Sequence, residues 1–202
     1  LFRSRRAGLN FVFCLFPVSS VLSVASVFVF VMVGIYMIAK KINGYARLLP
    51  EHINTDINCS SKYLPGKDNA YIAQHAYENV APGFASRFKP GDVIVAGKNI
   101  GINSSREQAV HIMKLMGVAA IVAPAFGRQF FRNCINNGLP VIECDIAGIA
   151  DGDAIEVDLA AGTVKVAARG IDRKVTVLPA AVQRILAEGG LIAFLQKHPD
   201  WS

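Results

Sequence analysis

The middle of this chain is predicted to form a strand, a loop and a helix in that order. A short β-branched run is followed by a loop between two glycines and then by apolar residues at helical spacing. The strand is predicted over Asp92–Ala96, directly after Pro90-Gly91. The loop covers Gly97–Gly101. From Ser104 the apolar residues recur at spacings of three and four until Gly117, where a C-terminal cap is expected. This order of elements is typical of an α/β fold.

Further strands and helices alternate along the rest of the chain. Apolar runs predict strands at 118–123 and 140–144, with a helix between them at 128–137. Such alternation indicates a partly parallel sheet. The last part of the chain is predicted to form, in order, a hairpin over 155–166 and helices over 180–187 and 191–196.

The predicted helix start at Ser104 carries an arginine where a cation is unfavourable. Ser104 and Glu107 fit the Ser-x-x-Glu capping box, in which each side chain satisfies an unpaired backbone amide. Arg106 does not fit this interpretation, because a cation in the first turn opposes the positive end of the helix dipole. A carboxylate bound there would meet backbone amides, the hydroxyls of Ser104 and Ser105, and a guanidinium suited to bidentate pairing. The sequence favours such an anion site over an ordinary capped helix.

The segment 97–109 resembles the signature of the small, swivelling subunit of isopropylmalate dehydratase and its relatives in the aconitase superfamily. The similarity extends in the family's order over residues 40–197, and its other matching segments are Asn54-Thr55-Asp56, Lys62-Tyr63-Leu64, 84–92 and 130–140. The resemblance implies a layered β/β/α swivelling domain. It also implies a hydro-lyase that acts on a hydroxy dicarboxylic acid and is active only with a larger subunit.

The resemblance assigns roles to the residues of the motif. In that family the first serine is the catalytic base, which corresponds to Ser104. Ser105 and Arg106 would hold a substrate carboxylate, with Arg106 as the orienting clamp. Asp56 is expected near the active site, although its triplet also fits a simple turn or cap.

Substrate choice in the family is attributed to the loop that corresponds to residues 63–69. Lys67 in this loop would contact a substrate carboxylate or remain a solvated surface lysine. Asn103 replaces a small residue and Gln108 a frequent histidine, which leaves the substrate side group open; Asn tolerates the left-handed backbone that such a turn requires. Isopropylmalate, used in leucine biosynthesis, is favoured over 2,3-dimethylmalate, methylmalate and homoaconitate.

The four cysteines do not form a metal-binding pattern. Cys14, Cys59, Cys134 and Cys144 contain no Cys-x-x-Cys pair. Cys134 falls in an apolar helical stretch and Cys144 at a strand end, so both are predicted to be buried thiols. No metal ligand is predicted in this chain, and the resemblance assigns a four-iron four-sulfur cluster to the large subunit. The chain is therefore expected to supply half of an active site.

Residues 1–36 differ in composition from the domain predicted over 37–202. No charged residue occurs between Ala7 and Ala39, and the stretch 9–38 exceeds the roughly 20 apolar residues that cross a bilayer. The segment is interpreted either as a membrane anchor or as sequence translated upstream of a start at Met37, which is favoured. Free cysteines suit a reducing compartment, so the domain is expected in the cytoplasm, or at a membrane if the anchor is native.

The charge balance limits the classes of partner. The net charge of +6 falls to +3 for residues 37–202 once the arginines at 3, 5 and 6 are set aside. So small an excess gives no support to a nucleic-acid-binding protein, which needs a dense basic face, and it suits an acidic substrate. No phosphate-binding or dinucleotide-binding glycine motif is present. The alternative from another class is a membrane-tethered interaction domain that kept the fold and lost the chemistry.

Overall fold

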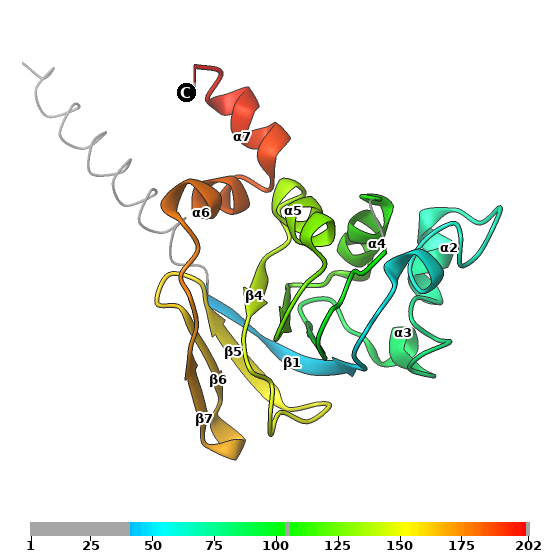
Figure 1. Ribbon diagram of the computed structural model, residues 1–202, viewed down its shortest axis with the longest axis horizontal. Coiled ribbons are helices and arrows are strands. Elements are labelled where there is room, and N and C mark those ends of the chain that lie inside the picture. The colour runs from blue at the N-terminus through cyan, green and yellow to red at the C-terminus, as the bar shows by residue number, and fades with distance from the viewer. Residues whose placement is uncertain (1–40, 104–105, 201–202) are drawn as a thin grey trace, which may run out of the picture. The chain divides into compact units, whose positions relative to one another are not determined.

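The computed structural model describes residues 41–103 and 106–200, which form a curled seven-stranded sheet with helices packed on it (Figure 1). The strands are β1 (Lys41–Leu49), β2 (Val93–Ala96), β3 (Ala120–Ala123), β4 (Val141–Glu143), β5 (Ala154–Asp158), β6 (Thr163–Val166) and β7 (Ile171–Lys174). The helices are α2 (Asn69–Gln74), α3 (Phe84–Arg87), α4 (Gln108–Met116), α5 (Arg128–Asn136), α6 (Ala180–Ala187) and α7 (Leu191–Lys197), with short 3-10 turns η1 (Thr55–Ile57) and η2 (Ala167–Arg169).

The sheet has a parallel and an antiparallel half that share β1, in the order β4-β3-β2-β1-β5-β6-β7. Strands β1 to β4 are parallel neighbours, whereas β5, β6 and β7 are antiparallel. The predicted α/β class, the partly parallel sheet, the β5–β6 hairpin and the last two helices are confirmed. In open α/β sheets, ligands bind at the carboxyl ends of the parallel strands, so we expect a site at this end of β1 to β4.

Alternating side chains of the parallel strands build two separate cores. Ile94 of β2 and Ile121 of β3 pack toward the helices, together with Phe130 of α5. Val93 and Val95 point the other way and pack against the antiparallel strands. Burial of each such side chain stabilises the folded protein by about 1.5 to 3 kcal/mol relative to leaving it exposed. One core lies between the helices and the parallel strands, and the other lies between the parallel and the antiparallel strands. This is the β/β/α arrangement that the resemblance implied.

The central strand β1 was not predicted, because its sequence carries a glycine and two cations. Gly44 is required by packing, since a Cβ there would lie 2.2 Å from the carbonyl oxygen of Gly91. Arg47 donates from Nε to the buried carboxylate of Asp92 at 2.6 Å. Gly44 and Arg47 are thus each accommodated by a contact with a residue distant in sequence.

Helix α4 begins later than predicted. Its first residue is Gln108, and Glu107 is the N-cap with a right-handed helical backbone and no capping hydrogen bond from its side chain. Arg106 therefore precedes the helix rather than occupying its first turn, and the capping box stays a prediction because Ser104 lies outside the described residues. The predicted C-terminal cap is confirmed, because Gly117 adopts φ 81° and donates its N–H to carbonyl groups of the last turn.

The hydrophobic segment 1–36, Met37 and the stretch 9–38 as a whole lie outside the described residues, so both interpretations of this segment stay predictions. Within 41–103 and 106–200, no helix combines the length and the apolar character needed to cross a membrane.

Candidate functional site

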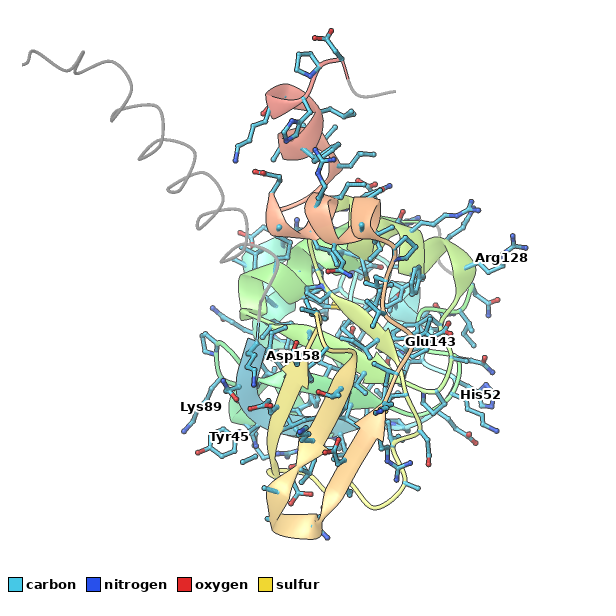
Figure 2. The ribbon with its side chains drawn as sticks, turned by 90° about the vertical axis from the view of Figure 1, so that its left-hand side faces the viewer. Tyr45, His52, Lys89, Arg128, Glu143 and Asp158 are labelled. Carbon is cyan, nitrogen blue, oxygen red and sulfur yellow. The ribbon has the colours of Figure 1, made fainter. Side chains whose placement is uncertain are left out.

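The carboxyl ends of β1 to β4 form one edge of the sheet, and polar side chains gather along it. His52 follows β1, Arg128 opens α5 after β3, and Glu143 ends β4. Figure 2 shows these three side chains on the same side of the molecule, opposite Tyr45 and Lys89. Open α/β sheets bind their ligands at this edge.

The loops that follow β1 and β2 are held together by backbone contacts. The N–H groups of Gly101 and Ile102 both donate to the carbonyl oxygen of Ile53, at 2.8 and 3.2 Å, and Asn54 forms an isolated bridge with Ile102. Asn103 then adopts φ 58°, the left-handed conformation predicted to be tolerated at this position. These contacts bring the chain before α4 beside the turn that contains Asp56.

Asp56, Lys62 and Arg106 form a cluster of charged side chains at this end of the sheet, and Asp56 is at its centre. It lies in η1, and its N–H donates to the side chain of Asn54, so the triplet also forms the cap that the sequence allowed. The carboxylate is 8% exposed, with Oδ2 2.8 Å from Lys62 Nζ and Oδ1 4.0 Å from Arg106 Nε. The structure therefore places Asp56 and Arg106 together.

Lys62 is a member of this cluster that the sequence argument missed. The hydroxyl of Ser60 donates to the carbonyl oxygen of Asp56 at 2.5 Å and accepts from the Lys62 N–H at 3.1 Å. This local turn brings Lys62 back to the Asp56 carboxylate. The only sequence signal was the place of Lys62, six residues after Asp56, inside the segment that resembles the family.

A glutamine connects the cluster to helix α2. The Arg106 guanidinium donates to Ser61 Oγ at 3.4 Å. Gln108 Oε1 accepts from both the N–H and the hydroxyl of Ser61, each at 3.1 Å, while Gln108 Nε2 donates to Asn69 Oδ1 at 2.8 Å. One side chain thus contacts two segments of the chain beside the cluster.

The remaining candidates differ in location. Lys67 is exposed, and its Nζ lies 4.8 Å from the centre of the Tyr71 ring, so the structure does not bring it into the cluster. Ser104 and Ser105 lie outside the described residues, between Asn103 and Arg106 in sequence. Their roles stay predictions.

The cysteines of the described chain do not fit an iron-sulfur cluster. Cys59, Cys134 and Cys144 are buried and unbridged, and the predicted burial of the last two is confirmed. Burial raises the pKa of the Cys59 thiol to about 12, and burial also raises the pKa of Cys134 and Cys144. Metals bind the thiolate, which these surroundings disfavour. Residues 41–103 and 106–200 contain no group of three or more His, Cys, Asp or Glu that could hold a metal ion.

An open pocket of about 240 Å³ lies at the same end of the sheet, after β3 and β4. Its lining includes Phe126, Arg128 and Glu143. Phe126 forms a bridge with Ile100, which belongs to the loop that leads to Arg106. The loops after β2 and β3 are therefore joined at the end of the sheet that carries both the cluster and this pocket.

Fold and edge together define an aconitase-type swivelling domain. The family described as the Aconitase C-terminal domain matches residues 48–145, a segment that includes the whole cluster. The alignments with two relatives cover almost the full length of each relative. The 3-isopropylmalate dehydratase small subunit 2 of Archaeoglobus fulgidus is 42% identical over 161 residues, which is 79% of this chain and 98% of the relative. The small subunit from Halothermothrix orenii is 41% identical over 154 residues, 75% of this chain and 93% of the relative.

A solved structure agrees with these relatives. The crystal structure of 3-isopropylmalate dehydratase from Methanocaldococcus jannaschii has a TM-score of 0.73 and 36% identity, covering 79% of this chain and 96% of that chain. The chain therefore belongs to the family of 3-isopropylmalate dehydratase small subunits, which are components of hydro-lyases in the aconitase superfamily.

Proposed function

We propose that this chain is the small subunit of a 3-isopropylmalate dehydratase and acts, with a large subunit, on an alkyl-substituted malate in leucine biosynthesis. The observation that carries the proposal is the convergence of Lys62 and Arg106 on the buried carboxylate of Asp56, at the carboxyl edge of a domain of this family. The cluster has the charge and the location that a dicarboxylate substrate requires.

The charges of the cluster favour a dianion. The side chains of Lys62 and Arg106 are 52% and 42% exposed, whereas that of Asp56 is 8% exposed. Both cations therefore face solvent while they pair with the buried carboxylate. One carboxylate against two cations leaves an excess of one positive charge, which attracts an acidic substrate. The planar guanidinium of Arg106 binds one substrate carboxylate bidentately, and Lys62 acts as a point charge toward the other.

Ser104 is proposed as the base that removes the proton from the carbon next to a substrate carboxylate. A serine hydroxyl is a weak acid, so its ionised form needs positive charge nearby. Lys62 and Arg106 supply that charge at the end of the loop that carries Ser104. Ser105 is proposed to share the binding of the carboxylate with Arg106. These assignments rest on the family motif and on the charges around it.

The iron-sulfur cluster is assigned to the large subunit in this proposal. Cys59, Cys134 and Cys144 of the described residues are buried, and burial raises the pKa of each thiol, so we propose none of them as a ligand of the cluster. Its own contribution is proton removal and the binding of carboxylates. The complete site then forms where the large subunit covers the Asp56 edge.

The test is dehydratase activity of the full chain co-expressed with a large subunit and purified without oxygen. Isopropylmalate, 2,3-dimethylmalate, methylmalate and homoaconitate form the substrate panel. Turnover of isopropylmalate above the others is expected, and the Ser104→Ala variant should form the same complex with no turnover. A stable complex without activity on any member of the panel would favour the non-catalytic alternative. Normal turnover by Ser104→Ala would remove Ser104 from the role of base.

A further inference from the structure

We infer that Gln108 is a positioning residue that closes the base of the loop 62–68 and so determines which substrate side group the site accepts; this inference rests on the proposed function. Gln108 is the first residue of α4 and is half-buried. Its two hydrogen-bonding partners, Ser61 and Asn69, are the residues that immediately flank the loop. A single side-chain amide therefore joins both ends of the loop.

The two ends of the amide make different bonds. The carbonyl oxygen of Gln108 accepts from Ser61 through both the backbone N–H and the hydroxyl, and the NH₂ group donates to the side-chain oxygen of Asn69. Ser61 needs an acceptor and Asn69 needs a donor, so an aliphatic side chain at position 108 would make neither hydrogen bond. The closure depends on the amide group itself.

The loop 62–68 is anchored at its start, where the N–H groups of Tyr63 and Leu64 donate to the Ser60 carbonyl oxygen and Leu64 packs against the core, but it has few anchors beyond Leu64. Asp68 caps α2 by accepting from the Tyr71 N–H, and the Lys67 N–H donates to Leu64. Residues 65–68 are exposed, and Gly66 adopts φ 76° in the turn. Exposed turns with few buried contacts open at low free energy, so their position is sensitive to the contacts at their base.

The same glutamine is coupled to the charges that hold the substrate. Ser61, fixed by Gln108, accepts from the Arg106 guanidinium, and the next residue, Lys62, pairs with Asp56. The loop thus begins at the residue that binds one substrate carboxylate. A shift of its base moves the loop relative to the bound carboxylates, which changes the room for the side group and leaves proton removal less affected.

The matched variants are Gln108→Ala, Asn69→Ala and Asn69→Asp. Asn69→Asp keeps an acceptor for Gln108, and an acidic residue in the first turn of α2 is favourable, so it should behave as the wild type. The control is Gln183→Ala, because Gln183 is also half-buried and donates from its side chain, to Leu178 in a different part of the fold.

The first measurement is amide hydrogen exchange of residues 62–68 in the full chain, which needs no activity. Exchange should become about tenfold faster in Gln108→Ala and Asn69→Ala and stay unchanged in Asn69→Asp and Gln183→Ala. Unchanged exchange in the first two variants would overturn the closure, whatever the activity of the enzyme.

The second measurement is the ratio of kcat/KM for isopropylmalate to that for methylmalate, in the complex with the large subunit. The ratio should fall about tenfold in Gln108→Ala and Asn69→Ala and recover in Asn69→Asp. Faster exchange with an unchanged ratio would overturn the role in specificity. Absence of wild-type activity on both substrates would instead count against the proposed function, while the exchange result would still decide the closure.

Discussion

Gly127 packs against Gly101 so closely that a Cβ atom on Gly127 would lie 2.3 Å from the Gly101 carbonyl oxygen. The backbone before α5 thus supports the loop that leads to Arg106. Gly127 has φ −63°, which any residue adopts, so the contact alone requires glycine there. We expect Gly127→Ala to lower stability by about 1 to 3 kcal/mol through overpacking and to reduce turnover by displacing the loop.

Urea unfolding together with turnover by the complex measures both effects of Gly127→Ala. Gly152→Ala is the control, because Gly152 has φ 83° and an added Cβ would meet nothing within 4 Å. Its cost is backbone strain alone, about 1 to 2 kcal/mol, without loss of activity. Equal turnover by both variants would show that the close contact does not support the site.

Arg106→Lys is expected to raise KM by about tenfold or more, because an ammonium cannot reproduce the bidentate pairing of a guanidinium with a carboxylate. Steady-state kinetics with the preferred substrate measure the change. Arg87→Lys in α3, which precedes β2 and lies away from the carboxyl ends of the strands, is the control, and its kinetics should resemble those of the wild type. Equal effects of the two substitutions would contradict the role of Arg106 as substrate clamp.

Asp92→Ala is expected to destabilise the domain by about 3 to 5 kcal/mol, because it leaves the Arg47 guanidinium without its buried partner. Asp92 is 2% exposed and also accepts from the Lys89 N–H at 3.0 Å. Asp172→Ala removes an exposed pair with Lys165 and should cost less than about 1 kcal/mol. Similar urea midpoints for the two variants would show that the Arg47–Asp92 pair stabilises no more than a surface contact.

Stability should fall in acid partly through Asp153. A hydrogen bond from Arg169, followed by one from the Ala150 N–H, holds the pKa of the Asp153 carboxyl below its usual range. A pKa lowered by folding stabilises the protein at pH values above the unfolded-state pKa, near 3.9, and this contribution is lost as the pH falls through the folded value. Wild-type protein should therefore lose more stability than Asp153→Asn between pH 5 and pH 3, as measured by urea unfolding. Parallel pH curves would contradict this role.

The sequence predicted those elements whose pattern is local. Helix α5 begins at Arg128 as expected, because its periodicity and the glycine after it are contained in one segment. Strand β1 was missed because Gly91 and Asp92 compensate for its glycine and its arginine. The start of α4 was misplaced because the loop before it is held by Ile53, a tertiary contact that the capping pattern does not contain.

The candidate site was also predictable only in part. The family motif identified Asp56 and Arg106, which the fold brings together. Lys62 and the Gln108 contacts were not predicted, because their significance depends on the burial of Asp56 and on contacts between segments far apart in sequence. Local patterns specify which residue types are present, and tertiary packing decides which of them share a partner.

The central place of β1 also shapes how the domain is made on the ribosome. Lys41 of β1 lies against Glu156 of β5, 115 residues later in the chain. Because β1 is translated before β5, one edge of β1 stays without its strand partner until β5 has been made. Sheets built on such distant pairing fold slowly and expose strand edges that invite aggregation. We therefore expect nascent chains of this domain to be prone to aggregation until translation has passed β5.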